Sequence, residues 1–462
     1  MTDAGSISAS RLPVFDRRRA AVLLHPSAFI GGHGGALGRR AFQFVDWLAE
    51  AGFSVWQILP LGPTGADGSP YWARSDRAGN PQLIDPGVEP PGGSEAFAAF
   101  RSENAHWLAD YALFEAIGSS RGGAPWWEWP MPLRDRDPLA LEVAARTLGA
   151  DIARICREQW QFDHQWSQLR AHARSRGVAL LGDLPIYVAP DSVTTWTERA
   201  QFQLGHDGQP TEVAGVPPDY FAADGQLWGN PLYAWDVMQA DGFRFWRERL
   251  GAQLARCDVL RIDHFRGLAA YWSVPAGSPN ARNGRWLEAA GAAMLDAVAA
   301  EHPDMPLVAE DLGVITPDVD ALRKRHRLPG MRVLQFAFDG GADNPHLPHN
   351  HERDSVVYSG THDNDTTAGW VATLGNHTRW RLHEYLDVQG GDPVGAVLRA
   401  TLASVGSLAV LPMQDLLRLG SDARFNTPGT TRGNWSWRAD PGWLTADLAR
   451  HYRYLNTLFG RS

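Results

Sequence analysis

Lysine and cysteine are nearly absent from this sequence. Lys324 is the single lysine, so almost all of the 43 Lys and Arg residues are arginine. Because Lys324 lies in a basic run with no glycine-rich loop before it, Schiff-base chemistry and P-loop phosphate binding have no well-placed candidate. The two cysteines, Cys156 and Cys257, are far apart and form no Cys-x-x-Cys pair, which excludes a disulfide scaffold and a zinc ribbon and favours a reducing compartment.

Long hydrophobic runs are also missing. No segment approaches the roughly 20 apolar residues of a membrane-spanning helix, and the apolar run at 20–24 is too short for a signal peptide. The net charge of −9 argues against nucleic-acid binding, because a phosphate backbone requires clustered positive charge. We therefore expect a cytoplasmic protein with no membrane or nucleic-acid partner.

What is present indicates a globular α/β protein. Hydrophobic residues make up 44% of the chain and charged residues 21%, and there are 20 tryptophans, a large number that is often found in proteins that stack on flat surfaces or on sugar rings. Short, continuous apolar runs alternate with helical patterns, as expected for parallel strands covered on both faces. Eight such runs are predicted as strands, at residues 21–25, 54–61, 178–187, 258–265, 306–313, 331–338, 355–364 and 408–417.

Eight strands alternating with helices predict a (β/α)8 TIM barrel. We expect one catalytic domain over residues 1–462, with mostly helical and loop insertions at the C-terminal face of the strands. A helical subdomain is expected at 86–176 and an active-site lid region at 189–250. Helices are predicted at 39–51, ending before Gly52, and at 285–300.

Carboxylates lie at the ends of several predicted strands. The fourth strand ends at Asp263, the fifth at Glu310, the seventh at Asp363, and the third contains Asp183. Since strand ends converge at one face of a barrel, these acids should lie together and raise at least one pKa, as a general acid requires. The alternative for each single acid is a structural pairing with an arginine, and Arg261 is available beside Asp263.

The reaction class follows from these carboxylates and from the motifs that are missing. The sequence contains no Gly-x-Ser-x-Gly elbow, no catalytic Cys–His context and no strand–GxGxxG–helix fingerprint. Paired carboxylates with many tryptophans favour glycoside chemistry, in which one carboxylate attacks the anomeric carbon and another acid protonates the leaving oxygen.

Six motifs stand out in the sequence: RIDHFRG (261–267), AEDLG (309–313), SGTHDNDT (359–366), GDLPIYV (182–188), GVPPDYFAADGQLWGNPLY (215–233) and NTPGTTRGNWSWR (426–438). Together they resemble the 4-alpha-glucanotransferases, also called amylomaltases or disproportionating enzymes, of the retaining α-amylase clan. By this resemblance Asp263 is the nucleophile, Glu310 the general acid and then base, and Asp363 the carboxylate that stabilises the transition state. Arg261 would keep Asp263 ionised by charge pairing.

The resemblance also implies a set of residues that contact the glucan. His264 and His362 would donate to sugar hydroxyls, with a purely structural contact as the alternative. The segment 215–233 resembles a loop that covers the site, and Trp228 in it is either a sugar platform or a core residue that fixes the loop. The other expected contacts are Ser69, Tyr71, Asp183, Asp219, Phe221, Gln226, Asn230 and Asn434.

No cofactor and no metal are expected. His346, His349 and His351 lie close together in the sequence and could bind a metal, but their segment matches a family loop that has none.

The resemblance therefore predicts an enzyme that transfers a segment of an α-1,4-glucan to the 4-hydroxyl of an acceptor through a covalent glucosyl-enzyme. Its expected partners are maltooligosaccharides, amylose or glycogen-derived glucans and glucose, and its expected state is a monomer or homodimer. The alternatives are an α-1,4-glucan hydrolase of the same clan and an inactive glucan-binding protein.

Overall fold

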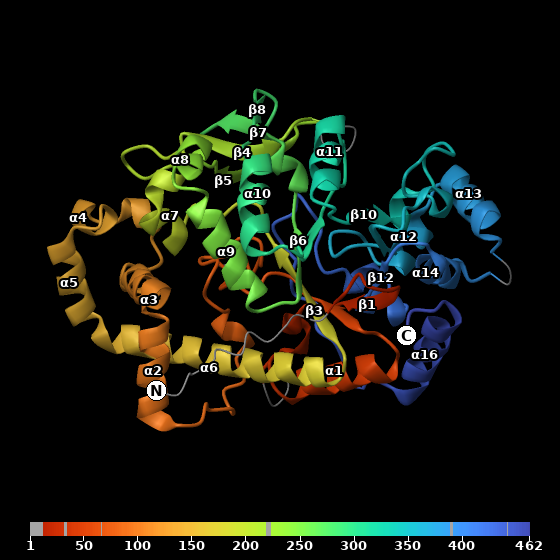
Figure 1. Ribbon diagram of the computed structural model, residues 1–462, viewed down its shortest axis with the longest axis horizontal. Coiled ribbons are helices and arrows are strands. Elements are labelled where there is room, and N and C mark those ends of the chain that lie inside the picture. The colour runs from red at the N-terminus through yellow and green to blue at the C-terminus, as the bar shows by residue number, and fades with distance from the viewer. Residues whose placement is uncertain (1–12, 32–34, 66, 219–222, 389–390, 441) are drawn as a thin grey trace.

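The fold is a parallel barrel of eight strands (Figure 1), in a computed structural model that describes residues 13–31, 35–65, 67–218, 223–388, 391–440 and 442–462. The strands pair in the order β10-β11-β12-β1-β2-β3-β6-β9. The amide of Ala309 donates to the carbonyl of Pro329 at 2.9 Å, so the barrel is nearly closed between β9 and β10. The predicted TIM barrel and its eight strands are thus confirmed, as β1 (Arg19–Leu23), β2 (Val55–Gln57), β3 (Ala179–Leu184), β6 (Val259–Ile262), β9 (Leu307–Ala309), β10 (Gly330–Val333), β11 (Ser355–Tyr358) and β12 (Leu408–Pro412).

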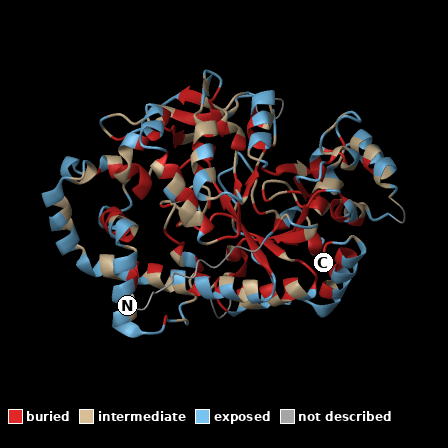
Figure 2. Cartoon of the chain, viewed as in Figure 1, coloured by how far each residue is buried: buried red, intermediate tan, exposed pale blue. Residues whose placement is uncertain are grey.

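Every barrel strand is buried on both faces, which explains its continuous apolar sequence. One set of alternating side chains packs inside the barrel, including Leu181, Val259 and Val308. The other set, including Leu180 and Leu260, packs outward against the helices. Figure 2 shows the buried strands at the centre and the exposed outer faces of the surrounding helices.

Helices cover the outside of the barrel. The predicted helix at 39–51 is confirmed as α1, and Gly52 follows it with a φ of 77°, which a residue without Cβ adopts readily. The covering helices are α1 (Arg39–Glu50), α6 (Gly149–Ser175), α9 (Arg244–Leu254), α10 (Gly291–Glu301), α11 (Pro317–Arg325), α12 (Thr367–Thr373), α13 (Asn376–Leu386), α14 (Pro393–Ala403), α15 (Met413–Leu416) and α16 (Ala446–Leu458).

A helical insertion between β2 and β3 has a core of its own. It contains α2 (Gly93–Glu103), α3 (Ala105–Ser120), α4 (Met131–Arg134) and α5 (Pro138–Thr147), and it packs on the N-terminal part of α6. Trp126 and Trp196 are fully buried in this core, and the Trp126 indole donates to the carbonyl of Pro190 at 2.9 Å. Many of the tryptophans are therefore packing residues.

A second, antiparallel sheet stands above the C-terminal end of the barrel. Its strands are β4 (Glu212–Val216), β5 (Gln226–Pro231), β7 (Ala270–Pro275) and β8 (Arg285–Glu288), in the order β5-β4-β7-β8, and α7 (Val193–Thr197) and α8 (Trp235–Ala240) flank it. The sequence did not predict this sheet, and the predicted helix at 285–300 is wrong in its first part. Residues 285–288 pair with β7, and the helix begins only at Gly291, because tertiary pairing overrides local propensity.

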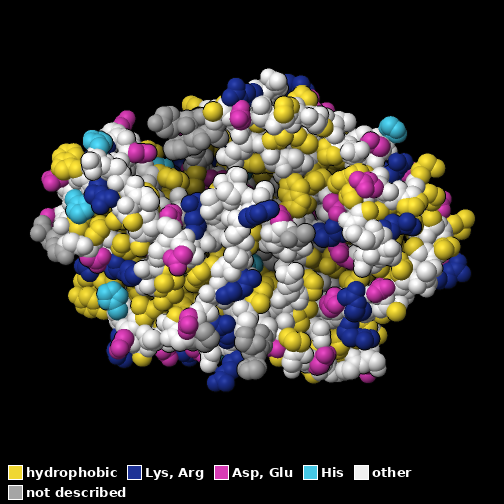
Figure 3. All heavy atoms as spheres, turned by 180° about the vertical axis from the view of Figure 1, so that it is seen from behind, with side chains coloured by type: hydrophobic (Ala, Val, Ile, Leu, Met, Phe, Trp, Pro, Cys, Tyr) yellow, Lys and Arg dark blue, Asp and Glu magenta, His cyan; other side chains and the backbone are white. Residues whose placement is uncertain are grey.

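Charges of both signs are interspersed with apolar side chains on the face shown in Figure 3. In the described part of the chain, no helix is long and apolar enough to cross a membrane. Cys156 and Cys257 are both buried and free.

Replacement of Trp56 tests the packing between barrel and helices. Trp56 is fully buried, donates to the carbonyl of Leu24 at 2.7 Å and packs against Phe29 and Phe44. We expect Trp56→Ala to lower the free energy of unfolding by about 3–5 kcal/mol, since it leaves a cavity. The matched control is Trp380→Ala, which removes a side chain that is 59% exposed. Equal losses in chemical denaturation for the two variants would contradict this.

Candidate active site

The interior of the barrel becomes polar at its C-terminal end. Side chains two positions apart on a strand point the same way, so Asp183 follows Leu181, Arg261 follows Val259 and Glu310 follows Val308 into the interior. These polar residues lie where active sites of TIM barrels are built.

The guanidinium of Arg261 joins two carboxylates. It donates to Oδ1 of Asp263 at 2.6 Å and to Oδ2 of Asp183, while Arg261 itself is buried. Burial alone would lower the pKa of Arg261, but the charges of Asp183 and Asp263 raise it well above its ordinary value. Arg261 therefore stays charged and holds the Asp263 carboxylate in one orientation.

Tyr71 completes the surroundings of Asp183. Its hydroxyl donates to Oδ2 of Asp183 at 2.7 Å, and its ring stacks on His362 with centroids 5.2 Å apart and planes 12° apart. Burial and the Asp183 carboxylate raise the pKa of Tyr71, so its hydroxyl remains a proton donor. The side chain of Asp183 has no exposed surface.

The titration of Glu310 is strongly changed by its surroundings. Its Oε2 accepts from the amide of His264 at 2.7 Å, and its Oε1 accepts from the amide of Leu312 at 3.0 Å. Burial, and after it the nearby Asp263 carboxylate, raises the pKa of Glu310 to about 8. At neutral pH Glu310 is therefore largely protonated beside the arginine-paired Asp263, an arrangement suited to a general acid next to a nucleophile.

Asp363 is the more open carboxylate, with 43% of its side chain exposed. Its Oδ1 accepts from the side-chain amide (Nδ2) of Asn426 at 2.6 Å and lies 3.3 Å from Nε2 of His362. The Arg424 guanidinium donates to the carbonyl of Asp363 at 2.5 Å. Asp363 is thus fixed from both sides and still presents an oxygen to solvent.

His264 and Trp228 form the wall next to Asp263. His264 has a φ of 51°, in the left-handed region, and its ring meets the Trp228 indole edge to face at 4.7 Å. Burial lowers the pKa of His264 to about 4, so the ring is neutral at pH 7. The Trp228 indole donates to Oε1 of Gln226 at 3.1 Å.

Comparisons with known proteins agree with this geometry. The 4-alpha-glucanotransferase family matches residues 24–92 and 88–445. The chain belongs to the 4-alpha-glucanotransferase family. Among the relatives, the Thermus thermophilus 4-alpha-glucanotransferase is 45% identical over 94% of this chain and 97% of that protein, and the one from Synechocystis is 42% identical over 97% and 99%. The amylomaltase from Streptococcus agalactiae, solved in complex with acarbose, has a TM-score of 0.93 at 32% identity and covers 96% of this chain and 100% of that one.

Three further residues expected from the family resemblance make bonds within the protein. Asn230 is buried and donates to the carbonyl of Val188 at 2.9 Å. Asn434 accepts from the amide of Thr427 at 2.9 Å and so shapes its own loop. Ser69 Oγ accepts from the amide of Tyr71 at 3.3 Å. The predicted contacts Asp219 and Phe221 lie outside the described residues.

Sequence reasoning missed two residues of this family member's site, Asn426 and Arg424. Both lie beyond β12, the strand next to β11, and hold Asp363 from this neighbouring segment. Asn426 begins the motif NTPGTTRGNWSWR, which marks the loop but not its contact with Asp363.

The histidine cluster makes protein contacts. His346 Nδ1 accepts from the amide of Val333 at 3.1 Å, and Nε2 of His351 lies 2.9 Å from the carbonyl of His346. His349 contacts the hydroxyl of Tyr385 at 2.7 Å. Over the described ranges, no group of three or more His, Cys, Asp or Glu residues is arranged to hold a metal ion.

The contribution of Asp263 to the raised pKa of Glu310 can be tested. Because the Asp263 carboxylate raises the pKa of Glu310, we expect Asp263→Asn to lower that pKa from about 8. Burial is the larger cause, so the pKa should stay above the ordinary value of about 4.3. An infrared titration of the protonated carboxyl band measures this. Asp447→Asn, at an exposed position of α16, is the control, and an unchanged Glu310 pKa in Asp263→Asn would contradict the assignment.

Proposed function

We propose that this member of the 4-alpha-glucanotransferase family cleaves an α-1,4 bond of a maltooligosaccharide and passes the donor segment to the 4-hydroxyl of another glucan or of glucose. The observation on which this depends most is the presence of the arginine-bound Asp263 carboxylate near protonated Glu310 at the mouth of the barrel, in a chain of this family. Such a pair is what retaining glycoside chemistry requires.

In the first step, a carboxylate oxygen of Asp263 attacks the anomeric carbon of the donor glucose. The bond to the glycosidic oxygen breaks as Glu310 gives its proton to that oxygen, so the reducing-end segment leaves as an alcohol. The donor segment is then an ester on Asp263. In the second step Glu310, now a carboxylate, takes the proton of the acceptor 4-hydroxyl, and that oxygen displaces Asp263 with overall retention.

The other polar residues orient this reaction. Asp183 has no exposed surface, so we assign it to positioning: it holds Arg261, which in turn holds Asp263. Asp363 accepts from hydroxyls of the distorted ring, and His362 and His264 donate to other hydroxyls, with His264 neutral because of its lowered pKa. Asn230 acts through the loop that it fixes.

The second sheet explains why transfer is favoured over hydrolysis. Strand β5 brings Trp228 against His264, the residue next to the nucleophile. A cover in this position limits the access of water to the glucosyl-enzyme while it waits for a sugar hydroxyl. Ser69, Tyr71, Gln226, Trp228 and Asn434, with Asp219 and Phe221, are the residues we propose to border the bound glucan.

We further propose that the enzyme works in the cytoplasm, as a monomer or homodimer, on maltooligosaccharides and on longer glucans derived from amylose or glycogen. The free, buried cysteines suit a reducing compartment. The residues of the site supply the chemistry without a cofactor or metal.

Incubation with pure maltotriose tests the proposed activity. We expect a ladder of longer oligosaccharides together with glucose and maltose, and a nearly constant number of reducing ends, because each transfer breaks one glycosidic bond and forms another. Chromatography and a reducing-sugar assay measure the two quantities. Only shorter products, with rising reducing ends, would indicate the hydrolase, and unchanged maltotriose would indicate a binding protein.

Removal of the nucleophile should abolish that ladder. We expect Asp263→Asn to reduce kcat on maltotriose on the order of a thousand-fold or more, as in other enzymes that lose their nucleophile. Asp447→Asn, far from the site on α16, should retain parental activity. Parental turnover in Asp263→Asn would rule out the assignment of Asp263.

The pH dependence should report Glu310. The first step needs this carboxyl protonated, and its pKa is about 8. The rate of glucosyl-enzyme formation should therefore fall as pH rises through about 8. A single-turnover rate measured between pH 6 and pH 10 checks this. In Glu310→Gln that limb should be absent from any residual rate, and its persistence would assign it to another group.

A further inference from the structure

We infer that Arg249, on the outer side of the barrel, is a positioning residue for the transfer reaction. It fixes the loop after β3 to the base of the second sheet, so that the wall formed by Trp228 and His264 stays beside Asp263. This inference rests on the proposed function. It adds a residue that determines how often the glucosyl-enzyme reacts with a sugar acceptor rather than with water.

Arg249 is a buried cation on α9 that binds a set of loop oxygens. It is 2% exposed. Its Nη2 donates to the carbonyl of Pro185 at 2.8 Å, and its Nη1 donates to the carbonyl of Ile186 and to the hydroxyl of Tyr233, each at 3.0 Å. The two carbonyls belong to irregular backbone after β3, and Tyr233 lies two residues after β5, so these acceptors are outside the regular ladders of the sheets.

The residues that Arg249 binds lead directly to the active-site wall. The Tyr233 hydroxyl also donates to the carbonyl of Ile186, which links the end of β5 to the loop after β3. The ring of Tyr187, the next residue, stacks on Tyr233 at 5.8 Å and lies 6.3 Å from Trp228. Trp228 in turn meets His264 at 4.7 Å. A continuous series of contacts therefore joins Arg249 to the neighbour of the nucleophile.

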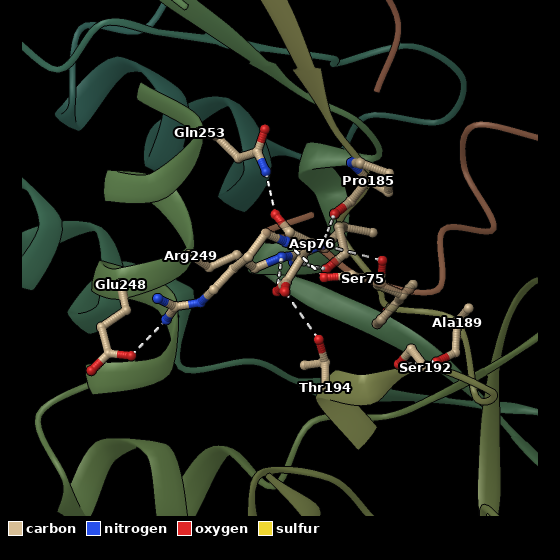
Figure 4. Close-up of polar contacts among 12 residues, drawn as sticks. Ser75, Asp76, Pro185, Ala189, Ser192, Thr194, Glu248, Arg249 and Gln253 are labelled. Carbon is tan, nitrogen blue, oxygen red and sulfur yellow. Dashed lines mark hydrogen bonds and ion pairs between the residues drawn. The ribbon is translucent and has the colours of Figure 1, made fainter. Parts of the chain in front are cut away.

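Asp76 supplies the charge that makes a buried Arg249 tolerable. Its Oδ2 lies 3.4 Å from Nε of Arg249, its Oδ1 accepts from the Thr194 hydroxyl at 3.0 Å, and its carbonyl accepts from the Gln253 amide (Figure 4). Breaking such a buried pair leaves an uncompensated charge, so both members are expected to stay ordered.

The Arg249–Asp76 pair is adjacent to the catalytic polar layer. A small pocket of about 30 Å³ is lined by Asp76 and Arg249 together with Tyr71 and Asp183. On its outer side the pair borders a groove of about 710 Å³. Arg249 thus lies between the protein surface and the residues that orient Asp263.

A second buried arginine, Arg461, serves as a control that separates a positioning role of Arg249 from a role limited to stability. Arg461 is fully buried and binds carbonyls as Arg249 does, but at the opposite end of the barrel, where it contacts Arg19, Leu402, Ser404 and Gly406. Arg249→Met and Arg461→Met remove the same group from equally buried places, so both are expected to lower Tm.

The decisive measurement is the number of reducing ends formed per transfer event from maltotriose. We expect Arg249→Met to raise this hydrolysis-to-transfer ratio about tenfold, because a displaced wall admits water. Arg249→Lys, which keeps the charge but not the planar set of donors, should lie between the parent and the methionine variant. Arg461→Met should stay within about twofold of the parent, since it touches no part of the site.

An unchanged ratio in folded Arg249→Met, or an equal rise in Arg461→Met, would overturn the inference. If Arg249→Met does not fold, Tyr233→Phe replaces it, because it deletes the hydroxyl shared by Arg249 and Ile186 at nearly constant volume, and the ratio should rise in the same direction. A parent enzyme that forms no ladder would instead overturn the proposed function, which keeps the two failures distinct.

Discussion

The ion pairs of Arg261 inside the barrel are the interaction on which the site depends. A guanidinium enclosed between Asp183 and Asp263 is stable only while both carboxylates face it, since a buried charge without a partner costs about 3–5 kcal/mol. That requirement fixes the register of β3 against β6, because Asp183 pairs with Arg261 across the two strands. It also holds the Asp263 carboxylate in place, and this carboxylate, after burial, contributes to the raised pKa of Glu310. One buried cation thus orders two carboxylates at the mouth of the barrel.

Arginine suits this role, and the scarcity of lysine is consistent with it. A planar guanidinium can bind two carboxylates at once, whereas an ammonium is a compact charge with a higher cost of desolvation. The same property recurs in Arg249 and Arg461, each of which binds several backbone carbonyls from a buried position. Irregular backbone segments in this protein are repeatedly held by buried arginines.

The barrel could be predicted from the sequence because its strands are buried on both faces and therefore read as continuous apolar runs. Asp263, Glu310 and Asp363 could be predicted as site residues because they lie at the ends of strands, and the strand ends of a barrel converge at one face. The second sheet could not be predicted, because strands such as β8 (Arg285–Glu288) are short, mostly exposed and defined only by their partners. Trp126 and Trp228 look alike in sequence, yet Trp126 is a core residue of the insertion and Trp228 borders the site; only tertiary packing separates them. Asn426 reaches Asp363 from a distant loop, and such contacts have no local pattern.

The second sheet is continuous in the chain with the nucleophile. The backbone leaves the barrel at Asp263, makes one short turn at Phe265–Leu268 and enters β7, which pairs with both β4 and β8. His264, with its left-handed backbone, is the joint between these two parts. The cover and the reacting carboxylate therefore form one mechanical unit rather than a lid on a separate hinge. Changes in the cover must therefore preserve this joint, so sequence variation should accumulate at the β7–β8 turn, away from the junction with the barrel.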